Sequence, residues 1–175
     1  KGGLGGDGFT LTICQIIDIA GWGRELGGAA QPAAKLGMAS CVVSRNAGGI
    51  LIHSGTADIE ASEFTANAGY GIVVDGPATV RFAEGKSPTR ISDNGTGGVF
   101  VVGATFTLRG GAQVVDNRGV GVRGDDAALN IEGATISGHP DAAVMYVRST
   151  GGVSTSTIVR NAGIGILVSD HSDIT

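Results

Sequence analysis

The stretch Asn67-Ala68-Gly69-Tyr70-Gly71-Ile72-Val73-Val74 recurs with few changes as Asn161-Ala162-Gly163-Ile164-Gly165-Ile166-Leu167-Val168. Related copies begin at Asn46, Asn94 and Asn117, and an earlier corner fits residues 19–23. Successive asparagines, from Asn46 to Asn161, are separated by 21, 27, 23 and 44 residues, and the last spacing equals two periods of 22. A fixed period of this length indicates a solenoid, in which each repeat is one structural unit stacked on its neighbours. The repeat therefore predicts about seven coils of roughly 22 residues each.

Two inward positions precede each corner, including the corner at His139, and one is large while the other is small. Three places back stands a large apolar residue: Val43, Phe64, Ile91, Val114, Ile136 and Ile158. Five places back stands a small one: Cys41, Ser62, Thr89, Ala112, Ala134 and Ser156. Alternation of period two predicts a strand with one face inward. With two more short strands in each period there is no room for helices, so each strand must pair with its equivalent in the next coil.

The asparagine at each corner has a physical role that its neighbours cannot fill. Its amide offers two donors and an acceptor, so stacked asparagines can bond from coil to coil. Asparagine also tolerates the left-handed backbone of a sharp corner, and the glycines after it suit positive φ. We expect a structural corner ladder of five residues: Asn46, Asn67, Asn94, Asn117 and Asn161. The missing step falls at His139.

The Asn-x-Gly-x-Gly-Ile-x-Val pattern resembles the right-handed parallel β-helix repeat of the pectate-lyase-like superfamily, over nearly the whole chain from Leu11 onward. The resemblance implies an all-β, right-handed parallel β-helix with three short strands per coil, and we treat residues 1–175 as one such domain. It implies little about activity, because lyases, hydrolases, epimerases, tailspikes and adhesins share this fold. Gly124-Asp125-Asp126 and Gly138-His139 match the polygalacturonase signature only in pieces, so no catalytic residue is assigned.

Composition excludes several function classes. Only 16% of the residues are charged and the formal net charge is −4, which argues against a nucleic-acid partner. No apolar run approaches the roughly 20 residues of a membrane-spanning helix. The sequence opens at Lys1 without an apolar leader and ends inside a repeat, so we interpret it as a segment of a longer or processed protein, in which the missing leader says nothing about export. We expect an extracellular or cell-surface location.

The outward residues of the strand after each corner form a largely apolar column. Its members are Leu51, Val73, Phe100, Met145 and Leu167, with Arg123 in the coil after Phe100. An exposed apolar stripe of this kind is typical of a partner-binding surface. The alternative is that apolar residues simply favour strands, and the sequence leaves both interpretations open.

Polar candidates are fewer. Asp93 and Asp116 precede their asparagines on adjacent coils and are weak candidates for a Ca²⁺ or catalytic pair, with a solvated turn as the alternative. The segment 83–90 lengthens one coil, and its Lys86 and Arg90 are candidates for contact with a polar ligand. The alternative for this segment is a surface loop without a ligand.

No cofactor is expected for this chain.

Both cysteines fall five places before a corner, in the small inward column. Cys14 and Cys41 are therefore expected to lie one coil apart in the core. Because a disulfide needs Cβ atoms somewhat closer than a relaxed coil spacing, we expect stacked thiols that act as small apolar side chains.

The functional expectation is an extracellular structural or adhesive scaffold that contacts a polysaccharide or another surface protein, without recognisable catalytic residues. End-to-end or lateral self-association is a further possibility for such a coil, because unpaired strand edges promote pairing. The alternative is a polysaccharide lyase, hydrolase or epimerase.

Overall fold

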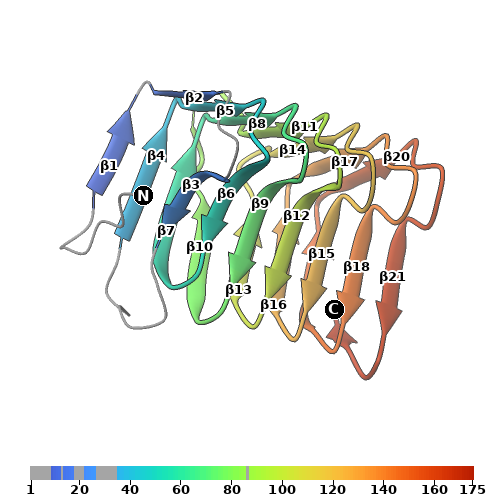
Figure 1. Ribbon diagram of the computed structural model, residues 1–175. Coiled ribbons are helices and arrows are strands. Elements are labelled where there is room, and N and C mark those ends of the chain that lie inside the picture. The colour runs from blue at the N-terminus through green and yellow to red at the C-terminus, as the bar shows by residue number, and fades with distance from the viewer. Residues whose placement is uncertain (1–8, 13, 18–21, 27–34, 86) are drawn as a thin grey trace.

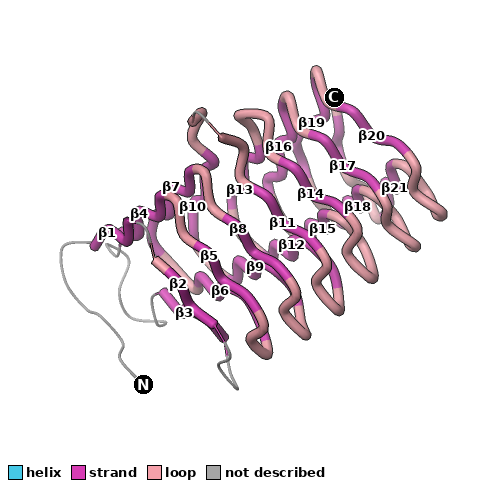
Figure 2. Tube along the Cα trace, turned by 90° about the horizontal axis from the view of Figure 1, so that it is seen from above, coloured by secondary structure: helices cyan, strands magenta, loops and turns pink. Residues whose placement is uncertain are grey.

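The computed structural model describes residues 9–12, 14–17, 22–26, 35–85 and 87–175, and these residues confirm the predicted fold. The chain winds as a right-handed parallel β-helix of about six turns. Figure 1 shows the strands of each sheet side by side along one axis, and Figure 2 shows the same stack from above. The described ranges contain strands and turns and no helix. The earliest corner, expected at residues 19–23, begins outside the described residues.

Each coil gives one strand to each of three sheets, named A, B and C in chain order. Sheet A contains β1 (Phe9–Thr12), β4 (Lys35–Ala39), β7 (Gly55–Glu60), β10 (Ala78–Phe82), β13 (Thr105–Leu108), β16 (Ala128–Glu132), β19 (Thr150–Ser154) and β22 (Asp173–Ile174). Sheet B contains β2 (Gln15–Ile17), β5 (Val42–Ser44), β8 (Glu63–Thr65), β11 (Arg90–Ser92), β14 (Gln113–Val115), β17 (Thr135–Ser137) and β20 (Thr157–Val159). Sheet C contains β3 (Trp22–Leu26), β6 (Gly48–Ile52), β9 (Tyr70–Asp75), β12 (Gly97–Val102), β15 (Val122–Asp125), β18 (Val144–Val147) and β21 (Ile166–Ser169).

The core consists of the inward columns that the sequence predicts. In sheet B the large residues pair in register from coil to coil, as Phe64 with Ile91 and Val114 with Ile136. These four side chains are fully buried. Burial of each such side chain stabilises the fold by roughly 1.5–3 kcal/mol, so the stacked columns are the main source of stability. The predicted inward register of these columns is confirmed.

At the corner between sheets B and C, hydrogen bonds join the side chains of four of the predicted asparagines from Asn46 to Asn117. The Asn67 Oδ1 atom accepts hydrogen bonds from the backbone N–H and from Nδ2 of Asn46, both at 3.1 Å. The Nδ2 of Asn67 in turn donates to Asn94 Oδ1 at 3.0 Å and to the Val43 carbonyl at 3.2 Å. The side chains of Asn46, Asn67 and Asn94 each join three coils in this way, which satisfies polar groups that would otherwise be buried without partners.

The backbone conformation at these corners differs from the expectation. The left-handed residue is the one before each asparagine, such as Ala66 with φ of 55° and Asp93 with φ of 59°. The glycines after the asparagines are required for another reason, because a neighbouring coil lies too close to their backbone to leave room for a Cβ atom. A Cβ on Gly71, for example, would lie 2.8 Å from Nδ2 of Asn94. The glycine turn therefore makes room for the ladder of the next coil.

His139 occupies the missing step of the ladder. Its backbone N–H donates to Asn161 Oδ1 at 3.0 Å, as the asparagines do among themselves. Its Nε2 lies 3.1 Å from the Val114 carbonyl, in the place where an asparagine Nδ2 would donate. The ring is fully buried, and this burial lowers the pKa of His139 against the opposing effect of the Val114 and Asn117 carbonyls and the Asp116 carboxylate. A neutral imidazole therefore substitutes for the corner amide.

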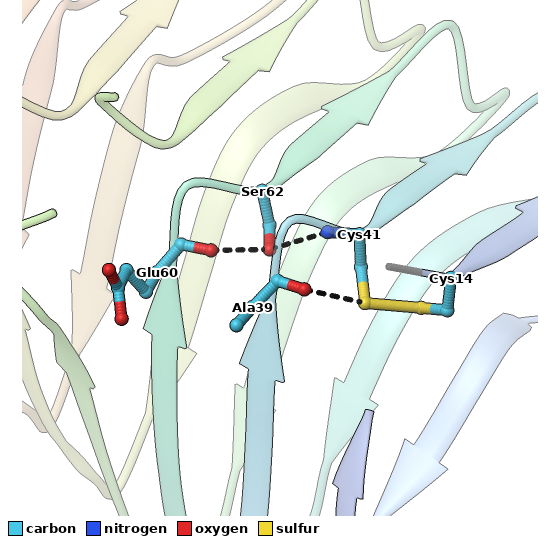
Figure 3. The surroundings of a disulfide bond; sticks show 5 residues. All are labelled: Cys14, Ala39, Cys41, Glu60 and Ser62. Carbon is cyan, nitrogen blue, oxygen red and sulfur yellow. Dashed lines mark hydrogen bonds between the residues drawn. A yellow bond between two sulfur atoms is a disulfide. The ribbon is translucent and has the colours of Figure 1, made fainter. Parts of the chain in front are cut away.

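The small column contains a disulfide, so the expectation of free thiols is wrong. Cys14 and Cys41 are joined in this structure, as Figure 3 shows. Their Cα atoms are 4.5 Å apart, which is within the range that a disulfide spans and closer than the relaxed spacing that the period suggests. The backbone N–H of Cys41 donates to Ser62 Oγ at 3.1 Å, which holds the next coil against the bridged pair.

The disulfide predicts that denatured, unreduced protein contains no titratable thiol. The bridge closes a separation of 27 residues, and a loop of this size contributes about 3 kcal/mol of stability. A Cys41→Ser variant should therefore unfold at clearly lower denaturant concentration than wild type. Two reactive thiols per denatured chain would contradict the bridge, and the isosteric Ser62→Cys variant would serve as a positive control for thiol detection.

Candidate functional site

The predicted apolar stripe lies on the outer face of sheet C, where its members pair from strand to strand. Leu51 pairs with Val73, Val73 with Phe100, and Met145 with Leu167. Four members are half-buried, whereas Val73 is only 9% exposed. The outward positions therefore align from strand to strand along the solenoid, and Arg123 interrupts the apolar column between Phe100 and Met145.

The middle of this face holds four side chains that we call the Phe100 cluster: Tyr70, Phe100, Arg123 and Asp125. The rings of Tyr70 and Phe100 stack with centroids 5.5 Å apart and an angle of 25° between their planes. The Arg123 guanidinium carbon lies 5.3 Å from the centre of the Phe100 ring. Stacked rings with a guanidinium against one face combine a broad apolar surface with fixed polar groups.

Asp125 fixes the position of the Arg123 guanidinium. The Nε and Nη2 atoms of Arg123 donate to the two carboxylate oxygens at 3.2 and 2.7 Å. Both residues come from β15, two positions apart, so they point to the same side of the sheet. The Asp125 side chain is 13% exposed and that of Arg123 is 37% exposed. A bidentate pair of this kind holds the guanidinium in one plane and leaves part of it open to a ligand.

The Tyr70 ring lies over Gly97 of the next coil, whose missing Cβ makes room for it. A Cβ at Gly97 would lie 2.5 Å from the ring carbon Cε1. Burial raises the pKa of the Tyr70 hydroxyl, the Arg123 guanidinium opposes that shift, and the carboxylates of Asp125 and Asp141 add to it. The phenol therefore stays protonated at neutral pH, as a hydrogen-bond donor at the edge of the cluster.

Sequence reasoning identified Phe100 and the column, but it missed the cluster. Tyr70 is a diagonal neighbour of Phe100, because the backbone register pairs Tyr70 with Gly97. The usable signals were a glycine opposite a tyrosine and the Arg-x-Asp spacing on one strand face. Neither signal fixes a ring orientation without coordinates.

The polar loop is only partly described. Lys86 lies outside the described residues. Arg90 begins β11, on the outer side of sheet B, where its Nη1 donates to Gln113 Oε1 and its Nε donates to Ser92 Oγ, both at 3.3 Å. The first of these bonds links β11 to β14, so the structure shows a structural role for Arg90.

Asp93 and Asp116 occupy left-handed positions directly before ladder asparagines, and both are exposed. Among the residues that the structure describes, no group of three or more His, Cys, Asp or Glu gathers as a metal site would require. The described residues therefore bring no third carboxylate to Asp93 and Asp116.

The last coil exposes several apolar side chains, namely Val159, Ile164, Ile166 and Val168. The inward partners of Ile166 and Val168 in the preceding strand are the buried Val144 and Tyr146. A further coil or a second copy of this chain would cover these positions.

Over the described ranges, no helix is long and apolar enough to cross a bilayer. Comparisons with protein-family models, with curated proteins and with solved structures gave no match for this chain.

Proposed function

We propose that this chain is an extracellular β-helix scaffold of the pectate-lyase-like type that adheres to carbohydrate through the outer face of sheet C. The observation that carries the proposal is the Phe100 cluster. Carbohydrate rings present apolar C–H faces edged by hydroxyl groups. A pair of aromatic rings beside a fixed guanidinium and a protonated phenol offers matching apolar surface and hydrogen-bond donors.

The shape of the surface also supports adhesion to a long molecule. The stripe runs along the solenoid from Leu51 to Leu167 in paired register, so repeating contacts follow one another at about 4.8 Å. A polymer lying along this direction meets one outward side chain per coil. The column has few charges, which suits a polymer of uncharged or weakly charged sugars.

The disulfide supports the extracellular location. Bridges such as Cys14–Cys41 persist in oxidising compartments and are uncommon in the reducing cytosol. The asparagine repeat from Asn46 to Asn161 supports the relationship to the pectate-lyase-like superfamily, because it matches that coil pattern along most of the chain.

A glycan array probed with the 175-residue protein tests the proposal. We expect retention on a subset of polysaccharides and oligosaccharides, with affinity that survives moderate salt because the surface is mainly apolar. Retention on no glycan would overturn the carbohydrate contact, and would leave another surface protein as the partner of this face.

One observation favours the enzymatic alternative. Asp75 and Asp125 both pair with Val102 and so share an outward column, two coils apart. Their strands are separated by roughly 9–10 Å, near the upper end of the roughly 6.5–9.5 Å between the carboxylates of inverting glycosidases. Against this, the Asp125 carboxylate is already held by Arg123.

Polysaccharides retained by the array should be incubated with wild type and with Asp125→Asn, followed by measurement of reducing ends and of the absorbance of unsaturated products. The scaffold proposal expects no product from either protein. Product formed by wild type and not by Asp125→Asn would establish a hydrolase or lyase instead.

A further inference from the structure

An open cleft of about 410 Å³ lies over the turns between sheets A and B, away from the outer face of sheet C. We propose that this cleft binds a small ligand with two ammonium groups and one carboxylate, of which a free dibasic amino acid is the simplest. The cleft combines three charged side chains from three successive coils with a floor of glycines: Glu84, Arg109 and Glu132, with Gly111 and Gly133. Its volume is within the ordinary range of small-molecule sites, roughly 300–1,000 Å³.

The wall of the cleft comes from the lengthened coil. The 27-residue spacing between Asn67 and Asn94 includes a segment after β10, and Glu84 in that segment lines the cleft. The backbone of this segment lies directly over the next turn, since a Cβ on Gly110 would come within 3.1 Å of the Glu84 Cα. The insertion therefore forms one wall of the cleft.

The floor is open because left-handed glycines line it. Gly111 has φ of 71°, and a Cβ built there would meet nothing within 4 Å. At Gly133, with φ of 61°, the nearest atom to such a Cβ would be Thr155 Oγ1 at 4.0 Å. These turns need glycine for their backbone, and the absence of side chains is what leaves space for a ligand.

The charges of the cleft are not used within the protein. Among the described residues, no side-chain hydrogen bond or ion pair joins Glu84, Arg109 or Glu132 to another group, and all three are exposed. The apolar groups of the lining are limited to the methylenes of its charged side chains and the methyl group of Thr155, so the site offers little surface to an apolar ligand. Among the lining residues that the structure describes, two carboxylates and one guanidinium give a net charge of −1, which complements a ligand with two cationic groups and one anionic group.

The spacing of the coils that carry the two carboxylates suits such a ligand. The coils of Glu84 and Glu132 are two strand spacings apart, or roughly 9–10 Å. An extended lysine separates its ammonium nitrogens by roughly 7 Å, and each can donate a charge-assisted hydrogen bond of about 2.8 Å. The ligand carboxylate then faces Arg109, which belongs to the coil between them.

Titrations followed by NMR chemical shifts at low salt test the proposal with three probes: L-lysine, L-norleucine without the ε-ammonium group, and cadaverine without the carboxylate. Wild type should bind L-lysine more tightly than either analogue. Glu132→Gln should weaken lysine and cadaverine by about two- to fivefold, as exposed ion pairs do. Arg109→Gln should lower the affinity for L-lysine by a similar factor and should not lower the affinity for cadaverine.

Two further variants separate the cleft from general surface charge. Arg81→Gln removes an exposed charge of sheet A that does not line the cleft, and it should bind L-lysine like wild type. Gly111→Asn keeps a residue type that tolerates the left-handed backbone and fills the floor, so it should lose binding. Equal binding of the three probes, or a loss in Arg81→Gln as large as in Glu132→Gln, would overturn the proposal, as would absence of binding.

Discussion

Replacement of Asn94 by alanine should lower the free energy of unfolding by about 3–5 kcal/mol, because it leaves several buried polar groups without partners. Asn94 is fully buried. Its Oδ1 accepts from the backbone N–H of Asn67 at 3.1 Å and from Asn67 Nδ2 at 3.0 Å. Its Nδ2 donates to the Phe64 carbonyl at 3.0 Å and to Asn117 Oδ1 at 2.9 Å. Urea denaturation followed by circular dichroism measures the loss.

Asn161→Ala is the matched control, since the same side chain there is partly exposed at the end of the ladder. Its Oδ1 accepts from the backbone N–H of His139 at 3.0 Å, and its Nδ2 donates to the Val159 carbonyl at 3.1 Å and only weakly, at 3.4 Å, to Ile136. Water can replace these partners, so we expect a loss of about 1 kcal/mol. Equal losses in the two variants would show that the ladder does not stabilise the coils as described.

The buried imidazole of His139 should make the wild-type protein sensitive to mild acid. Burial lowers the pKa of His139 in the folded chain below its ordinary value of 6.5, so the unfolded chain takes up a proton first. Stability is then fully present above pH 6.5 and decreases as the pH falls toward the folded pKa, by at most about 1.4 kcal/mol per pH unit. The expected loss between pH 7 and pH 5 is up to about 2 kcal/mol.

A His139→Asn variant should remove this contribution, because asparagine does not titrate and its Nδ2 can donate to Val114 as the ladder residues do elsewhere. Its Oδ1 would also give the Asn117 N–H an amide acceptor like the one that Asn117 gives to Asn94. His171→Asn, at an exposed left-handed position, should keep the wild-type pH dependence. Urea denaturation at several pH values checks this, and identical pH profiles for wild type and His139→Asn would refute it.

The fold was predictable because its determinants are periodic. Residues such as Phe64 and Ile91 stand at a constant distance from their asparagines, and that distance alone aligns them in one inward column. The ladder followed from the same spacing. Its backbone details did not, since the left-handed φ at Ala66 depends on the path of the whole corner and not on the residue that carries the amide.

The site was less predictable, because its contacts cross between columns. The placement of Cys14 beside Cys41 followed from the period. The bridge, however, depends on Cα atoms that lie 4.5 Å apart, a little closer than the ordinary strand spacing of about 4.8 Å. The stacking of Tyr70 on Phe100 depends on the space left by Gly97. The open cleft depends on the path of the segment after β10 over the turn at Gly110. The spacing of residues along the sequence does not determine where these side chains point or which path this loop follows.

The most direct test of the carbohydrate-binding scaffold is a comparison of glycan affinity between Phe100→Asp and Thr107→Asp. Both variants add one carboxylate to the same coil, the first on the outer face of sheet C and the second on sheet A. If the Phe100 cluster binds carbohydrate, Phe100→Asp should weaken binding by at least about tenfold, as loss of a central aromatic contact does, while Thr107→Asp binds like wild type. Equal affinity of the two variants for the glycans that wild type retains would contradict the assignment of this face.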